Sequence, residues 1–318
     1  MLCKPFFFKK SAKIFTNLLA FHIIKLYHIS MRRFIINPNA GKHKNLKVLE
    51  KDIKKVFSQD EIVYTKYAGH ARELAREAAQ KNYETVIAVG GDGTINEVTQ
   101  GLVNSDTALG IIPCGSGNGF ARLIKMPLKN NLKCLEIIKA NKTKKIDVGI
   151  AGAEYFLNVA GFGFDALIAQ KFASSKRRGR LPYFEIGVKE FFSFKADKYY
   201  LTFEDGTKQE ISPLCVAFAN GNQYGCDFVI APHASLDDGF LDMVFIKPAN
   251  VFKILLGLPN FLKENVSPVH LSETKQGKAV TINRKVPFAY HIDGEPRVCQ
   301  NGELKISVVP SALKIICL

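Results

Sequence analysis

The first half of the chain alternates between two hydrophobic periods. Short apolar runs bounded by polar or glycine-rich turns predict buried β-strands. These runs lie at residues 33–37, 61–65, 85–90 and 109–113. Between them, apolar residues recur at helical spacing and predict helices over residues 45–57, 70–80, 94–103 and 131–140. Strands that alternate with helices need right-handed crossovers, so this half is predicted to be an α/β domain with a parallel sheet.

After residue 145 the pattern changes to short strands with few helices. Asp205 and Gly206 form a hairpin signal between two apolar runs, because both residues tolerate positive φ. Further strands are predicted at residues 228–231, 240–246, 279–282, 288–292 and 304–309, and helical pieces at 165–175 and near 250–264. The second half is therefore predicted to be mostly antiparallel, a β-sandwich or a barrel, with a domain boundary near residue 149.

The first 30 residues are basic and loosely apolar, which imitates a signal sequence or a helix lying on a membrane surface. Asn17, His22 and Lys25 interrupt the apolar run, and no small-residue cleavage site follows it. Met31 stands directly before the first strand. We interpret residues 1–30 as an extension outside the fold, with a membrane anchor as the alternative.

The charge and the cysteines narrow the class of protein. A formal net charge of +15 over 318 residues favours anionic partners such as nucleotides, nucleic acid or an anionic membrane. Nucleic acid ranks below the others because the charge is spread along the chain, Trp is absent, and there is no recognisable groove-reading motif. The 7 cysteines contain no C-x-x-C pair, so we expect a reducing, cytoplasmic setting without disulfides.

Residues 86–98, VIAVGGDGTINEV, place a glycine-rich turn between a buried strand and a helix. Such a turn lets a ligand approach the backbone and aims helix N–H groups at an anion. The loop lacks the lysine of a Walker A motif, and Asn96 stands where a dinucleotide motif needs its last glycine. Asp92 would repel phosphate unless Mg²⁺ or a substrate hydroxyl lies between them. This pattern predicts phosphate chemistry assisted by a metal.

Two further loops follow neighbouring strands. PCGSGNGFAR, residues 113–122, offers three glycines, hydroxyl and amide groups and Arg122, and NPNAG, residues 37–41, follows the first strand. In a parallel sheet all three loops would meet at the carboxyl edge, where α/β sheets bind ligands. Together they predict a nucleotide site.

NPNAG, GGDGTINEV, PCGSGNGFAR and a late HIDGE at residues 291–295 resemble the diacylglycerol kinase catalytic-domain family, which includes bacterial lipid kinases and sphingosine kinases. The resemblance runs from Met31 to the C-terminus. It implies a nucleotide domain related to those of NAD kinases and phosphofructokinases. This domain would consist of residues 31–149 and of a C-terminal segment, about residues 304–318, that returns to it. A β-rich acceptor domain, residues 150–303, would follow, with the active site between the two.

The resemblance also assigns roles to individual residues. The nucleotide, ATP, would be bound by Asn37, Pro38, Asn39, Ala40, Gly41, Thr65, Gly91, Asp92, Gly93, Thr94, Ile95, Asn96, Glu97 and Ser116. The segment that reads GTxND in many bacterial relatives is GSGNG here, with Gly119 in place of the acid, as in sphingosine kinases. This departure puts the identity of the acceptor in doubt rather than the reaction.

The same resemblance makes Glu295 the proton acceptor, with Asp293 beside it and Asp92 as the third catalytic residue. It implies Mg²⁺ and a metal-binding loop, SLDDGFLD, in which Asp238 supplies a carboxylate and Ser235 and Phe240 supply backbone oxygens. Seen alone, Asp293-Gly294 and Asp238-Gly239 are ordinary hairpin turns. Only their occurrence in the whole set favours the functional interpretation.

The predicted function is that of an ATP-dependent lipid kinase that phosphorylates a diacylglycerol-like or sphingoid alcohol. Phenylalanines such as those of EFFSF, residues 190–194, and the basic stretch SKRRGR, residues 175–180, fit docking on the inner face of a membrane. An NAD kinase-like enzyme and a catalytically silent nucleotide or lipid sensor are the alternatives. A homodimer is left open.

Overall fold

The computed structural model describes residues 31–41, 46–175, 180–225, 228–249 and 272–318. The proposed N-terminal extension, the helix expected near 250–264 and the centre of the basic stretch at 175–180 lie outside these residues.

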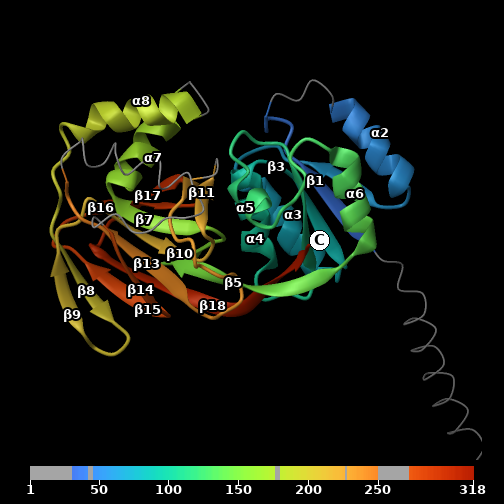
Figure 1. The fold of residues 1–318 in the computed structure, drawn as a ribbon. Helices are drawn as coiled ribbons and strands as arrows, with labels where there is room; N and C mark the ends of the chain where they lie inside the picture. Colours follow the sequence, from blue (N-terminus) through green and yellow to red (C-terminus); the bar gives the residue numbers. More distant parts are fainter. Residues whose placement is uncertain (1–30, 42–45, 176–179, 226–227, 250–271) are drawn as a thin grey trace, which may run out of the picture.

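The N-terminal half is built on a parallel sheet in the strand order β2-β1-β3-β4. Its strands are β1 (Arg32–Ile36), β2 (Glu61–Tyr64), β3 (Thr85–Gly90) and β4 (Ala108–Pro113). Its helices are α2 (Leu46–Val56), α3 (His70–Gln80), α4 (Asp92–Leu102), α5 (Gly119–Leu123) and α6 (Asn131–Ala140). Strands β3 and β4 are buried along their whole length, because α3 and α4 pack together on one face and α2 and α6 on the other (Figure 1).

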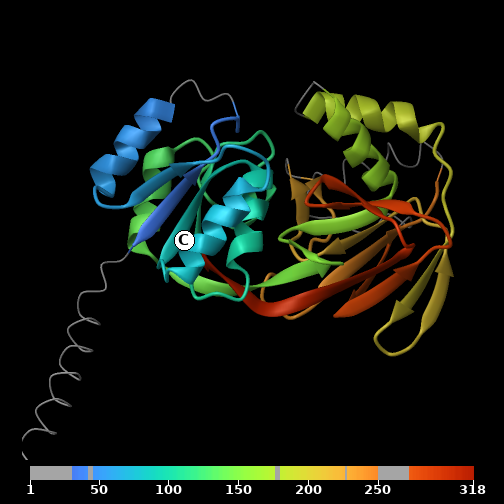
Figure 2. The same cartoon turned by 180° about the vertical axis from the view of Figure 1, so that it is seen from behind.

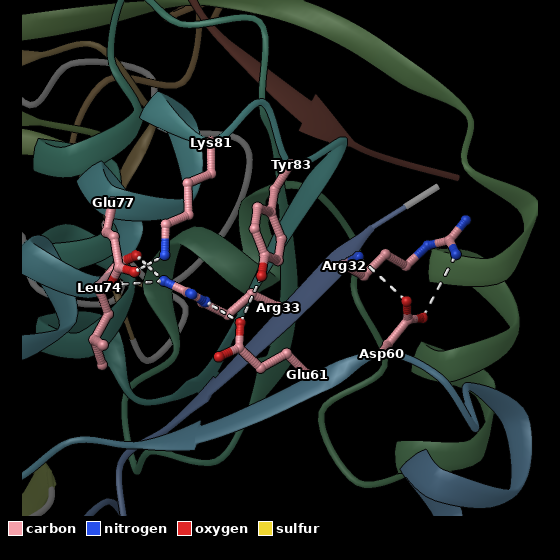
Figure 3. Close-up of polar contacts among 8 residues, drawn as sticks. All are labelled: Arg32, Arg33, Asp60, Glu61, Leu74, Glu77, Lys81 and Tyr83. Atoms are coloured by element: carbon pink, nitrogen blue, oxygen red, sulfur yellow. Dashed lines mark hydrogen bonds and ion pairs between the residues drawn. The ribbon is translucent and has the colours of Figure 1, made fainter. Parts of the chain in front are cut away.

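A buried arginine fixes the first strand to its neighbours (Figure 3). The guanidinium of Arg33 is hydrogen-bonded to Glu61 of β2 at 2.6 Å and to the carbonyl of Leu74 in α3 at 2.9 Å. Its charge also faces Glu77 and lies 4.8 Å from the ring centroid of Tyr83. A charge this deep is tolerated because its hydrogen-bond donors are used, so Arg33 sets how β1, β2 and α3 pack.

The C-terminal half is an antiparallel sandwich. One sheet has the order β14-β13-β10-β7-β16-β17, and every pairing in it is antiparallel. Its strands are β7 (Val159–Gly163), β10 (Cys215–Ala219), β13 (Leu241–Ile246), β14 (Ser272–Gly277), β16 (Phe288–Ile292) and β17 (Glu295–Cys299). It packs against β8 (Tyr199–Phe203) and β15 (Ala279–Asn283) through a core that includes Phe162, Phe218 and Ile282. Strand β9 (Lys208–Ile211) extends that second layer.

Two long strands run through both halves (Figures 1 and 2). Strand β18 (Glu303–Ile316) pairs with β15 of the sandwich near its start and with β4 of the parallel sheet at Ile315. Strand β5 (Thr143–Ala151) pairs with β18 along most of its length, with an irregularity between Val309 and Leu313. The two halves therefore share one continuous sheet, and the proposed boundary near residue 149 falls inside β5.

Smaller elements border the junction of the halves. Strand β6 (Glu154–Phe156) pairs with β5, and β11 (Gln223–Gly225) pairs with β12 (Phe228–Val229). Helix α7 (Phe164–Ser174) packs on β7, β16 and β17, on the sheet face opposite the sandwich core, and α8 (Arg180–Phe191) lies against α7 (Figure 1).

The α/β and antiparallel classes predicted from the pattern are confirmed, but several elements differ from it, and the short elements α5, β11 and β14 are not among those predicted. Helix α8 is not predicted because Pro182 and Gly187 weaken its local signal. It is stabilised by packing instead: the rings of Phe172 and Tyr183 lie 5.3 Å apart, in α7 and α8. Strand β17 is not predicted either, and β18 continues to Ile316 rather than ending at 309.

The shared strand β5 leaves no room for a side chain at Gly149. A Cβ there would lie 2.1 Å from the ring of Phe156, which is fully buried in the sandwich core. We expect Gly149→Ala to lower the free energy of unfolding by about 1–3 kcal/mol through overpacking. Thermal and urea unfolding measure this change.

Gly187→Ala is the matched control for that substitution. Gly187 lies inside α8, and an added Cβ meets no atom of the described residues within 4 Å. Here alanine should stabilise by about 0.5–1 kcal/mol, because it lowers the entropy cost of the helix. Equal effects at the two positions would contradict the packing argument.

Candidate active site

Three loops meet at the carboxyl edge of the parallel sheet, as the sequence predicts. The N–H of Asn37, after β1, donates to the carbonyl of Val89 in β3 at 3.0 Å, and its side-chain amide donates to the Thr94 hydroxyl of α4 at 3.0 Å. The N–H of Asn39 donates to Asn37 Oδ1 at 2.9 Å, which closes the NPNAG turn. The N–H of Thr65, after β2, donates to the carbonyl of Ile36. Asn37 thus borders the start of α4, and Thr65 lies beside the end of β1.

The two glycine-rich loops pack backbone against backbone. The N–H of Cys114 donates to the carbonyl of Gly90 at 2.7 Å. A Cβ on Gly115 would lie 2.7 Å from the Cα of Gly91, so neither a side chain nor a wider loop fits there. Gly117 approaches Asp92 in the same way, since a Cβ on Gly117 would lie 2.8 Å from Asp92 Oδ2. Ser116, between these glycines, is exposed.

Asp92 begins helix α4 and points its carboxylate at the start of α5. Burial first of all, and then the negative charge of Asp293, raise the pKa of Asp92 above its usual value. The backbone N–H groups of Asn118, Gly119 and Phe120 oppose this rise. Asp92 Oδ1 is inaccessible to solvent and has no hydrogen-bond partner among the described residues. An orphaned carboxylate oxygen of this kind is a donor that Mg²⁺ prefers.

The sandwich brings the HIDGE segment to the first turn of α4. Ile292 and Glu295 pair across a two-residue hairpin turn formed by Asp293 and Gly294, whose φ angles are 48° and 85°. The side chain of Glu295 is exposed, and its Oε1 lies 3.8 Å from the position that a Cβ of Gly93 would occupy. A carboxylate therefore faces the glycine–aspartate loop from the other half of the chain.

Asp293 joins the two halves through four hydrogen bonds. Its Oδ1 accepts the N–H groups of Asn158 and Val159 at 2.8 and 3.1 Å, and its Oδ2 accepts Leu157 N–H and the Asn96 amide at 2.9 Å each. Burial raises the pKa of Asp293, and these donors oppose that rise. Since its oxygens are occupied, we assign Asp293 a positioning role within the proposed catalytic set.

The remaining predicted residues of α4 do not all face the loop. Glu97 caps the start of α3, where its carboxylate accepts the N–H groups of Gly69 and Ala71 at 2.9 and 3.2 Å. Ile95 is buried in the core, and its N–H bonds to the Gly91 carbonyl inside the helix. We expect these two residues to support the nucleotide site through the position of α4.

The proposed metal loop is organised partly by a residue that the sequence argument did not select. Asp147, buried in β5, accepts Gly239 N–H at 2.6 Å and Ser311 N–H at 2.7 Å. Asp238 Oδ1 accepts the N–H of Phe240 at 3.0 Å, and Ser235 donates to Asp237 at 2.7 Å. The signal for Asp147 was present in the sequence as one acid inside the apolar strand KIDVGIA.

The oxygen atoms that this loop could offer to a metal ion are one side-chain carboxylate and two backbone carbonyls. Asp238 is exposed and offers one carboxylate, and Ser235 and Phe240 would add backbone carbonyls. In the described part of the chain, no three His, Cys, Asp or Glu residues gather in a way that could hold a metal. The assignment of Ser235, Asp238 and Phe240 to a metal stays a proposal.

Comparison with known proteins matches both halves of the chain. A family model described as "Diacylglycerol kinase catalytic domain" matches residues 32–151, and one described as "YegS C-terminal NAD kinase beta sandwich-like domain" matches residues 158–317. The chain is 30% identical to a diacylglycerol kinase of Bacillus subtilis over 272 residues, which cover 83% of this chain and 89% of that protein.

Other relatives and a solved structure agree with these matches. A diacylglycerol kinase of Mycobacterium tuberculosis is 32% identical over 78% of this chain and 82% of its own length. A probable lipid kinase YegS-like protein of Chromohalobacter salexigens is 31% identical over 77% of this chain and 79% of its own. The crystal structure of a diacylglycerol kinase from Bacillus anthracis superposes with a TM-score of 0.69 at 22% identity, covering 91% of this chain and 97% of that one. This likeness shows the fold.

The raised pKa of Asp92 predicts that its charge lowers the stability of the folded protein. In the unfolded chain this carboxyl loses its proton above a pKa of about 3.9, whereas in the folded chain it holds the proton to a higher pH. The group therefore lowers the stability of the folded chain above that pKa, and the effect grows with pH until the folded pKa is passed. We expect Asp92→Asn to raise Tm by a few degrees at neutral pH, and this gain should vanish as the pH falls towards about 4.

Asp205→Asn is the control with the opposite sign. The pKa of Asp205 is lowered, first of all by a hydrogen bond from the backbone N–H of Thr207 in an exposed turn. Its substitution should leave Tm unchanged or lower it at neutral pH. Thermal melting of both variants between about pH 4 and pH 8 measures the difference. A lower Tm for Asp92→Asn at every pH would contradict the expected sign.

Proposed function

The chain belongs to the diacylglycerol kinase family, and on that premise we propose that it transfers the γ-phosphate of ATP to a hydroxyl group of a membrane lipid. The observation that carries the proposal is the approach of Glu295 to Gly93, which places a carboxylate of the sandwich over the loop of the α/β half that would bind phosphate. A general base next to a phosphate-binding loop fits a site that transfers a phosphoryl group rather than one that only binds a nucleotide.

The start of α4 is suited to the phosphates of ATP. Its N-cap residue, Gly91, has no side chain to occupy the first N–H groups of the helix, and Gly93 leaves the next turn open. Such N–H groups, at the positive end of the helix dipole, bind anions. The NPNAG turn and Thr65 lie at the same edge and would contact the rest of the nucleotide.

Glu295 would accept the proton of the acceptor hydroxyl as that oxygen attacks phosphorus. Its exposed side chain can reach a substrate, whereas the oxygens of Asp293 are held by four N–H groups. Mg²⁺, when bound, would neutralise charge on the transferring phosphate, and Asp92 has a carboxylate oxygen without a partner among the described residues that fits such an ion. Asp293 would keep the turn that carries Glu295 against Asn96 of α4.

We further propose that the acceptor is a lipid and that the protein meets it at a membrane surface. Tyr183 of α8 and Phe192, directly after that helix, are 43% and 73% exposed. Lys189 and Lys195 lie in or just after α8 and would face anionic head groups. In the described residues no helix is long and apolar enough to cross a membrane. We propose that the chain docks on the membrane from its cytoplasmic face.

The acceptor is identified by transfer of labelled phosphate. The purified chain is incubated with Mg²⁺, γ-labelled ATP and vesicles that contain diacylglycerol, sphingosine or another lipid alcohol, with NAD as a soluble arm. Label in a lipid alone supports the proposal. Label in NAD alone would replace it with an NAD kinase-like activity, and ATP binding without any transfer would identify a sensor.

Removal of the proposed base should slow the reaction without affecting nucleotide binding. We expect Glu295→Gln to lower kcat at least about 100-fold, which is the usual scale for a lost acid–base group. The Kd for ATP should stay within a factor of about two, since Gln keeps the size of the side chain. Initial rates and equilibrium binding of a nucleotide analogue measure the two quantities.

Glu273→Gln controls for the general effect of removing one glutamate charge. Glu273 lies on β14, where it forms an exposed ion pair with Lys275 at 3.3 Å. Its variant should retain full activity, because exposed pairs contribute little. A near-native kcat for Glu295→Gln would remove Glu295 from the mechanism.

A further inference from the structure

A buried polar cluster lies behind the turn that carries Glu295, and the proposed mechanism does not use it. It consists of His291 in β16, Asp165 in the first turn of α7 and Tyr224 in β11, three elements that lie side by side in the sandwich half (Figure 1). His291 Nε2 lies 3.0 Å from Asp165 Oδ2, and the Tyr224 hydroxyl donates to the same oxygen at 2.9 Å. The side chains of His291 and Asp165 are only 2% and 12% exposed.

The hydrogen bonds determine which nitrogen of His291 carries the proton. The backbone N–H of Gly294 donates to His291 Nδ1 over a long distance, 3.4 Å, so Nδ1 must be the acceptor. Nε2 then carries hydrogen and donates to Asp165. Through its two nitrogens, His291 connects the Asp293-Gly294 turn to the start of α7.

The surrounding backbone leaves space for this cluster. Gly161, which faces His291 across the β7–β16 ladder, could not carry a side chain. Its Cβ would lie 2.4 Å from Asp165 Oδ2 and 2.9 Å from His291 Nε2. Burial also raises the pKa of Tyr224 well above its usual value, which keeps its hydroxyl a donor to Asp165. The cluster is therefore held in one arrangement by sterics and by hydrogen bonding.

We propose that His291 is a positioning residue for Glu295, which it serves by holding the N–H of Gly294 and by anchoring the turn, through Asp165, to helix α7. Glu295 needs such support because it begins the edge strand β17 and its side chain is exposed. Asp293 anchors the turn by accepting the backbone N–H groups of residues 157–159. His291 anchors it by accepting the N–H of Gly294. A displacement of about 1 Å at a catalytic group can lower a rate on the order of 100-fold.

The inference rests on the proposed function and deepens it. Asp165 belongs to α7, which packs against α8, the helix that we propose to face the lipid. His291 therefore connects these helices to the turn that carries Glu295, the proposed base. A residue that acts in this way affects the rate of transfer rather than the binding of ATP. This difference separates positioning from a general contribution to stability.

Two substitutions test separately the contacts made by the two ring nitrogens of His291. In His291→Asn the side-chain oxygen can take the place of Nδ1 and accept the N–H of Gly294, but the contact with Asp165 is lost. In His291→Gln the amide can take the place of Nε2 and donate to Asp165, but the contact with Gly294 is lost. We expect His291→Gln to lower kcat about 10- to 100-fold with an unchanged KM for ATP, as losses of supporting hydrogen bonds do. His291→Asn, which keeps the hydrogen bond from Gly294 but loses the anchor to Asp165, should lower kcat by a smaller factor and also leave the KM for ATP unchanged.

The measurements are kcat and KM for ATP with the lipid that accepts label, Tm, and amide hydrogen exchange of Gly294. Exchange at Gly294 should be faster in His291→Gln than in the wild type and unchanged in His291→Asn. His233→Gln, at an exposed histidine outside the proposed site, is the control and should match the wild type in every measurement.

A wild-type kcat for His291→Gln would overturn the inference. So would equal losses in the Asn and Gln variants that follow a fall in Tm, since these would indicate a structural role alone. A wild-type chain that phosphorylates no lipid would refute the proposed function instead. In that case the exchange of the Gly294 amide still decides whether His291 anchors the turn, because it needs no turnover.

Discussion

The carboxylate of Asp293 is the interaction on which the arrangement of the site depends. It accepts the Asn96 amide from α4 of the α/β half and three consecutive backbone N–H groups that lead into β7 of the sandwich. The same residue occupies the hairpin turn that presents Glu295. One buried carboxylate thus fixes the phosphate loop, the start of the sandwich sheet and the proposed base relative to one another. Four hydrogen bonds offset part of its cost in desolvation, and the pKa of Asp293 stays raised because burial outweighs them.

Around this junction the molecule keeps features that favour chemistry over stability. Asp92 and Asp293 lie close enough for the charge of one to raise the pKa of the other, and Asp92 has an oxygen atom without a partner in the described structure. Two acids in such surroundings lower the stability of the folded chain unless a cation joins them. The shared strands β5 and β18 connect the two halves that carry these acids.

Several parts of the fold and site could be predicted because their signals are local. The apolar strands β1, β3 and β4 and the helical stripe of Ile95, Val98 and Leu102 follow directly from hydrophobic periodicity. Helix α8 and strand β17 could not be predicted in this way, since α8 is stabilised by ring contacts with α7 and β17 by its pairing with β16. Glu97 shows the same limit within the site: its place in the motif suggests the nucleotide, but its carboxylate caps α3.

The sequence by itself determined the α/β and antiparallel character of the two halves, and the gathering of three polar loops at one sheet edge. The reason is that parallel strands carry their following loops to the same side. Only the tertiary structure decided the register in which β18 pairs with β15 and with β4, and that Glu295 faces Gly93. It alone also showed that Asp147 holds the loops of Gly239 and Ser311, and that His291 contacts Asp165, although these residues are remote in sequence. These contacts join residues with no local pattern in common, and they depend on how strands pair and side chains pack after the elements have formed.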